Sequence, residues 1–321
     1  MKTVLVDNSL CASALCDDAK AEDICGYIKA LAAAGVRYVE LDFRAIMKLR
    51  RLPEGIGYIF RAVDPMFLQL TEVFNFDYVL LTFSDLKKNM KLKVPIMLEL
   101  PFVENTHRGV LRYAQSQIDG TITAVRFCDD FGLKSFDEMK KFVSDMKNAV
   151  PLPVDFCPRN SRKTALDCAL KLTFADADSV TLGMARTNRF ASLEEYVLTL
   201  LSVYDMIPRN IDIYELFGAA FYYKRIFRNP MDADFVKLLE MIDWDIRMLQ
   251  NADTGERVKL NIALKNACLL KKTFSSALEK MIKNSDFDAK EIKALVGAIK
   301  HFDASIYSDK VLNENNKILL N

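Results

Sequence analysis

Histidine is scarce in this chain of 321 residues, which has only His107 and His301. Any metal site would therefore draw mainly on carboxylates, amides or thiols. The net charge is also close to zero, because the chain has 44 basic and 43 acidic residues. No cluster of basic residues contains interleaved aromatic residues. This balance argues against nucleic acid as a partner.

Long apolar runs are also missing. No stretch reaches the ~18 to 20 residues that a membrane span needs, and residues 1–10 lead directly into a strand-like segment. We therefore expect a soluble protein with no membrane partner and no export signal. The seven cysteines are odd in number, scattered and free of CxxC pairs. This usage suits reduced thiols in a cytoplasmic protein.

Eight short segments rich in β-branched or aromatic residues alternate with longer amphipathic segments, which is the pattern of parallel βα units. The expected strands are residues 3–7, 38–43, 58–63, 78–83, 95–100, 123–128, 153–157 and 179–183. Eight such units predict a (β/α)8 TIM barrel of the α/β class. The alternative, a doubly wound open sheet, would have fewer strands and a glycine-rich first turn, and the sequence contains no GxGxxG or Walker-type loop.

Helix signals lie between the expected strands. Gly35 is placed to end one helix, and Ser135 with Glu138, like Ser192 with Glu195, has the spacing of a capping box. After residue 208 the strand pattern stops, and helical segments follow at about 211–227, 232–250, 258–283 and 288–302. We therefore expect a barrel over residues 1–206 and a helical C-terminal region over residues 207–321, which packs on the barrel or on a second subunit.

Polar residues gather at the ends of the expected strands, where barrels of this type place their sites. They include Asp7, Cys11, Glu40, Arg61, Thr82, Glu99, Arg126, Cys128, Asp129, Asp155, Cys157, Arg159 and Asn160. A structural alternative is an ion-pair network that fills the barrel, formed by Glu40, Arg61, Glu99 and Arg126, because buried charges persist only when paired. In the same way, Asp7 and Asp129 could simply accept backbone hydrogen bonds at strand ends. Cys128 and Cys157 could be inert small hydrophobic residues.

Arg108 stands apart from these alternatives. It follows Glu104 and His107 in a segment that we predict to be a loop, where no core needs a guanidinium. A forked donor of this kind suits a carboxylate or phosphate of a substrate. Arg108 is therefore predicted to bind an anion.

Seven segments in order carry a resemblance to a known family. They are VDNSLCAS, AAAGVRYVELDF with Glu40, TFSDLKKNMKLK, Glu104 to Arg108, Asp129 to Gly132, CPRNS, and GMARTNRFASLEEYV. Over about residues 1–205 the chain resembles the HMG-CoA lyase-like superfamily, also called DRE-TIM metallolyases or pyruvate carboxyltransferase domains. Within this superfamily it is most similar to the homocitrate and 2-isopropylmalate synthases.

The resemblance implies an enzyme that uses a divalent metal to make or break a carbon–carbon bond next to a 2-oxo acid, often with acetyl-CoA as co-substrate. The metal positions have changed, however. Cys11 and Ala12 stand where the family has its catalytic arginine and a metal-binding aspartate, and Cys157 and Arg159 stand where it has two metal-binding histidines. Because alanine and arginine cannot coordinate a cation, the resemblance implies that the usual metal site is lost.

Three functional hypotheses remain open. The first is a rebuilt acyl-transferase or lyase, with Glu40 or Asp7 as the base and Cys11 or Cys157 as a nucleophile. Its substrate, a small 2-oxo or dicarboxylic acid, would be held by Arg61, Thr82, Glu104, Arg108, Asp129, Arg159 and Asn160. The second is a non-catalytic barrel that binds a small anionic metabolite or a partner. The third keeps a metal, with Asp7, Cys128 and Cys157 favouring zinc. Homodimerisation through the C-terminal region is expected by analogy with the synthases.

Overall fold

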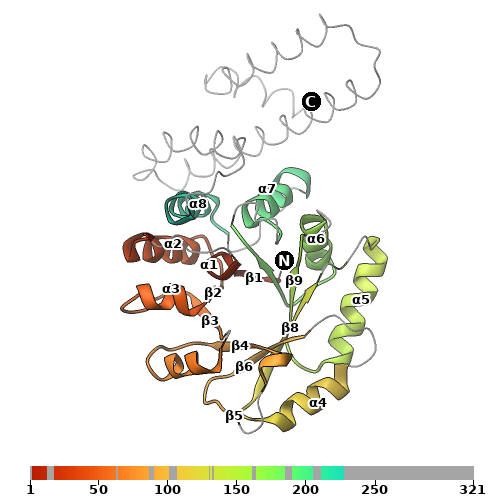
Figure 1. The fold of residues 1–321 in the computed structure, drawn as a ribbon. Helices are drawn as coiled ribbons and strands as arrows, with labels where there is room; N and C mark the ends of the chain where they lie inside the picture. The colour runs from red at the N-terminus through yellow and green to blue at the C-terminus, as the bar shows by residue number, and fades with distance from the viewer. Residues whose placement is uncertain are drawn as a thin grey trace, which may run out of the picture. The chain divides into compact units, whose positions relative to one another are not determined.

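The computed structural model describes residues 2–12, 18–62, 64–86, 90–100, 107–129, 131, 134–160, 164–184, 190–204 and 211–227. These residues form a barrel of parallel strands surrounded by helices (Figure 1). The helices that the sequence predicts at 232–250, 258–283 and 288–302 lie outside the described residues.

The barrel closes through eight parallel strands. They are β1 (Val4–Asp7), β2 (Tyr38–Leu41), β3 (Gly57–Arg61), β4 (Tyr78–Thr82), β6 (Ile96–Leu100), β8 (Ile122–Asp129), β9 (Val154–Pro158) and β10 (Ser179–Leu182). Their order around the barrel is β1, β10, β9, β8, β6, β4, β3 and β2, and β2 pairs with β1 again. Each expected strand overlaps one of these, so the (β/α)8 barrel is confirmed. A small parallel sheet of β5 (Met90–Lys91) and β7 (Ile118–Asp119) was not predicted.

Helices and 3-10 turns connect the strands. They are α1 (Ser9–Ala12), α2 (Ala21–Ala33), α3 (Phe43–Lys48), η1 (Pro65–Glu72), η2 (Phe83–Asp85), α4 (His107–Gln117), α5 (Phe136–Ala149), α6 (Ala165–Phe174), α7 (Leu193–Tyr204) and α8 (Ile213–Phe227). Among the described helices, none combines the length and the apolar character needed to cross a membrane.

The capping signals work as the sequence predicts. The Ser135 hydroxyl accepts a hydrogen bond from the amide of Glu138 at 3.3 Å, and the Glu138 carboxylate accepts one from the Ser135 amide at 2.6 Å. Gly35 follows α2 with a φ of 87°, a conformation that glycine adopts without strain. The second strand ends earlier than expected. The Asp42 side chain accepts a hydrogen bond from the Ala45 amide at 3.1 Å, and this cap starts α3 where the strand was expected to continue.

The barrel interior has an apolar layer near the amino ends of the strands. It is formed by Val6, Ile59, Leu80, Met97 and Ala124, with Tyr38 and Tyr78 packed against it. Because side chains alternate along a strand, the next inward-facing position lies two residues further on. The interior of the barrel therefore changes from apolar to charged towards the carboxyl ends of its strands.

Helix α8 packs against α2, as Figure 1 shows. The rings of Tyr27 and Tyr223 lie 6.2 Å apart, and Arg225 Nη2 lies 2.9 Å from Asp23 Oδ1. The chain divides into two compact units, Met1–Leu200 with Ile207–Asp243, and Leu201–Met206 with Trp244–Asn321. Helix α8 thus belongs to the same unit as the barrel, and a domain boundary at residue 206 stays a prediction.

Replacing Gly57 by alanine is expected to lower the free energy of unfolding by about 1–3 kcal/mol, because a new Cβ would overpack this position. That Cβ would lie 2.4 Å from the ring of Tyr38 and 3.0 Å from Asp77 Oδ2. Urea unfolding measures the change. Gly109→Ala is the matched control: nothing lies within 4 Å of a Cβ there, and the helix α4 should gain about 0.5–1 kcal/mol. Equal effects of the two substitutions would contradict the packing of Tyr38.

Candidate functional site

Arg126 spans the interior of the barrel just beyond the apolar layer. Its side chain starts on β8 and is fully buried. Nε lies 2.5 Å from Asp155 Oδ2 on the neighbouring strand β9, and Nη1 forms an ion pair with Glu40 on β2. Since β2 stands opposite β8 in the strand order, this guanidinium ties the two sides of the barrel together.

Arg61 on β3 continues the line of charges. Its Nε lies 2.5 Å from Glu40 Oε1, and its Nη2 lies 2.7 Å from Glu99 Oε2 on β6. At the other end of the line, Asp155 also accepts hydrogen bonds from Ser179 at 2.7 Å and Thr181 at 2.6 Å. The structure thus contains the ion-pair network that the sequence left open as an alternative.

The charge of Glu40 is fixed by its two partners. Burial alone raises the pKa of this carboxyl, but Arg61 and Arg126 outweigh burial and lower the pKa to about 2. Glu40 is therefore ionised at neutral pH, and guanidinium groups occupy both of its oxygens. Such a carboxylate is a weak base. A catalytic role for Glu40 stays a prediction.

Asp7 faces the surrounding helices. Its Oδ1 accepts a hydrogen bond from the Tyr27 hydroxyl on α2 at 3.0 Å and from the Ser9 amide at 3.2 Å, and its Oδ2 accepts the Ser9 hydroxyl at 2.7 Å. Complete burial raises the pKa of Asp7 to about 7 despite these hydrogen bonds. This geometry matches the structural alternative for Asp7, and its predicted role as a base stays untested.

Four residues meet at the carboxyl ends of β1, β8 and β9, and we call them the mouth cluster: Asn8, Cys128, Cys157 and Arg159. Asn8 Nδ2 lies 3.9 Å from Cys157 Sγ, and Arg159 Nε lies 3.3 Å from Cys128 Sγ. Cys128 and Cys157 are register partners on β8 and β9, so their thiols lie side by side. The cluster therefore joins a partly solvent-exposed cation to two thiols.

The remaining thiol near the network is Cys11. Its burial, together with the neighbouring carboxylates of Glu40 and Asp42, raises the pKa of Cys11 well above its usual value. Burial likewise raises the pKa of Cys157. Neither thiol is favoured as a thiolate at neutral pH, so the structure gives no support to either as a nucleophile.

The other predicted binding residues divide into two groups. Asn160 and Thr82 have local partners: Asn160 Oδ1 accepts the Ala165 amide at 3.3 Å, and the Thr82 hydroxyl donates to Asp85 at 2.5 Å. The side chains of Arg108 and Asp129, and all of Glu104, lie outside the described residues. The prediction that Arg108 lies in a loop is wrong, because its backbone is in the first turn of α4.

The donors near this site do not match a divalent-cation site. Both oxygens of Asp7 are hydrogen-bonded, and the carboxylates of Glu40 and Asp155 are paired with arginine. In the described part of the chain, no group of three or more His, Cys, Asp or Glu side chains could hold a metal ion. Asp7 is accordingly not brought together with Cys128 and Cys157 as the third hypothesis requires.

Three buried side-chain polar atoms of the described residues lack a hydrogen-bond partner, and two of them lie at this end of the barrel. These two atoms are Nη2 of Arg126 and Oδ1 of Asn8. The residues Arg126 and Asn8 are 0% and 2% exposed. Buried polar groups nearly always have partners, so an unpaired donor and an unpaired acceptor indicate a place for a water molecule or a ligand. Cys157 lies close to both residues.

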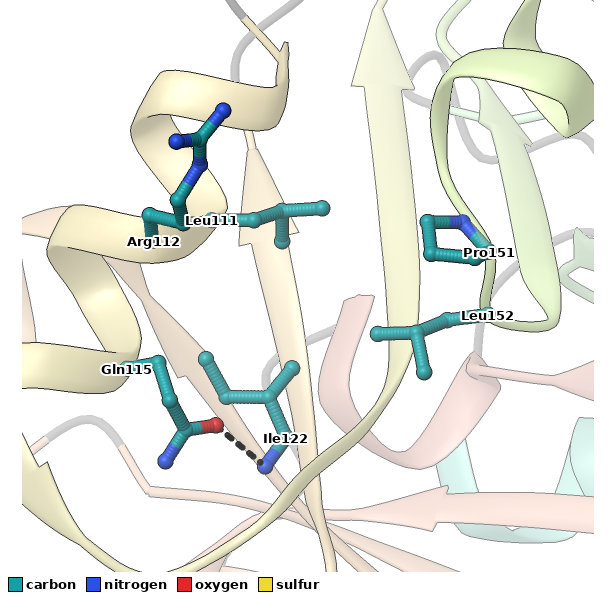
Figure 2. A pocket seen from close by; sticks show the side chains of 6 residues that line it. All are labelled: Leu111, Arg112, Gln115, Ile122, Pro151 and Leu152. Atoms are coloured by element: carbon teal, nitrogen blue, oxygen red, sulfur yellow. Dashed lines mark hydrogen bonds between the residues drawn. The ribbon is translucent and has the colours of Figure 1, made fainter.

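A separate cavity of about 350 Å³ lies at the opposite, amino-terminal end of the strands. Leu111 of α4, Ile122 at the start of β8 and Leu152 before β9 point into the same apolar space (Figure 2). At the edge of this cavity, Oε1 of Gln115 accepts a hydrogen bond from the Ile122 amide at 3.3 Å. In TIM barrels this end serves stability, whereas chemistry takes place at the other.

The fold and the position of the mouth cluster define a (β/α)8 barrel with a site at the carboxyl ends of its strands. HMG-CoA lyases from Pseudomonas aeruginosa and A. baumannii have the same fold, with TM-scores of 0.56 and 0.55 at 13% and 12% identity. These matches cover 75% and 73% of this chain and 98% and 94% of theirs. The A. baumannii enzyme was solved in complex with coenzyme A and 3-methylmalate.

In sequence, the chain is 23% identical to the omega subunit of homocitrate synthase from Clostridium pasteurianum over 202 residues. The match covers 60% of this chain and 55% of that protein. No family model matches the chain. The chain is thus similar in sequence to homocitrate synthase and in fold to HMG-CoA lyases, which agrees with the resemblance that the seven sequence segments indicate.

Several contributors to the site were missed in the sequence. Ser179 and Thr181 stand two residues apart in the last strand, and this alternation of polar residues in an otherwise apolar segment could have revealed them. Asn8 directly follows the first strand and belongs to the polar residues at the strand ends, but no role is predicted for it from the sequence. Tyr27 comes from a helix, and no sequence signal connects it with Asp7.

Proposed function

We propose that this barrel binds a small organic acid, a dicarboxylate or 2-oxo acid, at the mouth cluster without a divalent metal. The observation that carries the proposal is the setting of Arg159. Its Nε contacts the sulfur of Cys128 at 3.3 Å, and none of the ion pairs of the described residues includes Arg159, although the charge of Glu99 acts on it. Arg61 and Arg126, in contrast, are engaged by carboxylates.

Arg159 is suited to hold a carboxylate. A guanidinium presents a fork of donors that pairs with both oxygens of a carboxylate. Arg159 lies just past the end of β9 and is exposed, so its remaining donors can be reached from solvent. The unpaired Oδ1 of Asn8 adds an acceptor close by, which fits a hydroxyl group on the same acid.

Binding without a metal follows from the charges at this end of the barrel. In the related enzymes implied by the resemblance, a cation neutralises the acid. Here Arg159 stands at the position of a metal-binding histidine, and a divalent ion beside a guanidinium would be repelled. The buried carboxylate of Glu40, which the structure describes near this position, is already paired with Arg61 and Arg126. Arg159 itself supplies the positive charge.

Catalysis with an acyl-CoA is the second candidate, and it draws on the similarity to homocitrate synthase. A 3-methylmalate and coenzyme A complex of a barrel with the same fold shows that such a barrel can hold both molecules. Against a rebuilt catalytic centre stand the weakly basic Glu40 and the raised pKa values of Cys11 and Cys157. Binding of the acid is therefore the function that the geometry supports better.

Calorimetric titration with 3-methylmalate, malate and 2-oxoglutarate tests this proposal, in buffer depleted of metal on a chelating resin. We expect saturable binding of at least one acid by the unmodified chain. Arg159→Ala should weaken that binding at least tenfold, because charge-assisted hydrogen bonds to a guanidinium contribute about 1.5–3 kcal/mol. Arg159→Lys, which keeps the charge and loses the fork, should lie between the two.

Arg44→Ala is the matched control for this titration. Arg44 pairs with Asp42 at 2.6 Å on the surface of α3, and its removal should leave the affinity unchanged. Equal affinity of Arg159→Ala and the unmodified chain would contradict the proposal, as would the absence of binding for all three acids.

A further inference from the structure

Cys128 and Cys157 stand directly opposite each other on neighbouring parallel strands. In the register of β8 with β9 they are Cα partners, and their side chains share the inner face of the barrel. Neighbouring strands lie about 4.8 Å apart. This spacing falls within the Cα separation of roughly 4.4–6.8 Å that a disulfide requires. The register therefore places the two cysteines within the Cα range of a disulfide.

The two thiols differ in their surroundings. The Cys128 sulfur accepts a hydrogen bond from Arg159 Nε at 3.3 Å, whereas Cys157 Sγ lies 3.9 Å from Nδ2 of Asn8. Cys128 therefore has a cationic donor and Cys157 a neutral one. The neighbouring Cys157 and Arg159 lower the pKa of Cys128 against the effect of burial. Cys157, being wholly buried, keeps its proton.

We propose that Cys128 and Cys157 form a peroxide-sensitive dithiol, in which Cys128 is the attacking sulfur and Cys157 the resolving one. Hydrogen peroxide is the oxidant. The Cys128 thiolate attacks one peroxide oxygen, the O–O bond breaks, and the other oxygen leaves as water once protonated. Cys157 then attacks the resulting sulfenic acid, which forms the S–S bond and releases a second water. In sum, two thiols and one peroxide give one disulfide and two waters.

Other thiols in the described part of the chain lack this arrangement. Cys168 lies on α6 and is 1% exposed, and Cys25 lies on α2. Burial and the neighbouring carboxylates of Glu40 and Asp42 raise the pKa of Cys11, which disfavours its thiolate. Cys128, in contrast, is 8% exposed and contacts the exposed Arg159 rather than a carboxylate.

Oxidation would also change the setting of Arg159. The disulfide is neutral and no longer offers a thiolate to the guanidinium, which leaves its donors for another anion. The affinity for the organic acid should then rise, by about threefold or more. This consequence rests on the proposed function, whereas formation of the disulfide does not.

Peptide mapping of the full chain tests the dithiol directly. After treatment with one to five equivalents of hydrogen peroxide and blocking of free thiols, trypsin releases residues 127–134 and 148–159, each with a single cysteine. We expect these two peptides to be joined by a disulfide that dithiothreitol reverses. Dimedone should label residue 128 in Cys157→Ser, where the sulfenic acid has no partner, and should label neither position in Cys128→Ser.

The unmodified chain is sufficient to decide the matter, even where a variant folds poorly. Cys168→Ser is the matched control and should form the disulfide like the unmodified chain. Recovery of both peptides unlinked, or a link between residue 128 and another cysteine, would overturn the proposal even where organic acids bind. A 128–157 disulfide in a chain that binds none of the acids would instead leave the dithiol standing and contradict only the proposed function.

Discussion

Replacing Arg126 by methionine is expected to lower the free energy of unfolding by about 3–5 kcal/mol, because Asp155 would lose its arginine partner and Glu40 one of its two. Arg126 is fully buried and pairs with Glu40 and with Asp155. Methionine fills much of the volume of the arginine stem, so the loss reports the charges more than a cavity. Urea unfolding followed by circular dichroism measures the change.

Two variants sharpen this measurement. Arg44→Met removes an arginine whose side chain is 42% exposed and pairs with Asp42, and it should cost less than about 1 kcal/mol. Adding Asp155→Asn to Arg126→Met removes the carboxylate that lost its arginine partner and should recover part of the loss. A cost below 1 kcal/mol for Arg126→Met would show that the ion pairs do not hold the barrel together.

The second large effect concerns the pH dependence that Asp7 imposes on stability. Burial raises the pKa of Asp7 from 3.8 to about 7 in the folded chain. The folded state therefore binds this proton more tightly than the unfolded state does. The stabilising contribution is complete below pH 3.8 and is lost as the pH rises through about 7. Between pH 5 and pH 8 the loss amounts to about 3 kcal/mol.

Asp7→Asn isolates this contribution, because asparagine keeps an acceptor for Tyr27 and does not titrate. The difference in unfolding free energy between Asp7→Asn and the unmodified chain should grow in favour of the variant by about 3 kcal/mol from pH 5 to pH 8. Urea unfolding at a series of pH values measures it. Asp145→Asn, at an exposed position of α5, should follow the unmodified chain within about 0.5 kcal/mol. A constant difference for Asp7→Asn would mean that Asp7 is ionised throughout.

The barrel itself was predictable because its signals are local and repeated. Each strand is a short apolar segment, and helices begin at residues such as Ser135, whose cap depends on neighbours three positions away. The end of the second strand was predicted too late, and the cause is again local. Asp42 caps α3 at the place where the strand was expected to continue. Strands β5 and β7 were not predicted, because two residues each are too few to show an alternation of apolar and polar residues.

The site was predictable in its residue types and less so in its pairings. Alternation along a strand tells that Glu40 faces inward, and the resemblance tells that it belongs to the site, but neither tells that Arg126 reaches it from the opposite side of the barrel. The same holds for Cys128 and Cys157, whose alignment depends on the register of β8 with β9. Register between strands that are distant in sequence is a tertiary property, which one sequence does not encode in any short pattern.

The ion-pair network and the binding proposal support each other. Inside the barrel the described carboxylates Glu40, Glu99 and Asp155 are all paired with Arg61 or Arg126. Among the described arginines of the strand ends, Arg159 is then the one that an incoming acid would meet without a carboxylate partner. This arrangement differs from a metal-dependent site in one testable respect, namely its indifference to divalent ions.

Titration of the chain with 3-methylmalate, in metal-depleted buffer and again with magnesium, manganese or zinc added at 1 mM, tests the central claim most directly. If Arg159 supplies the positive charge, the dissociation constant should stay the same within about twofold in all four conditions. Binding that appears only when a divalent ion is present, or that tightens tenfold or more with one, would contradict the account.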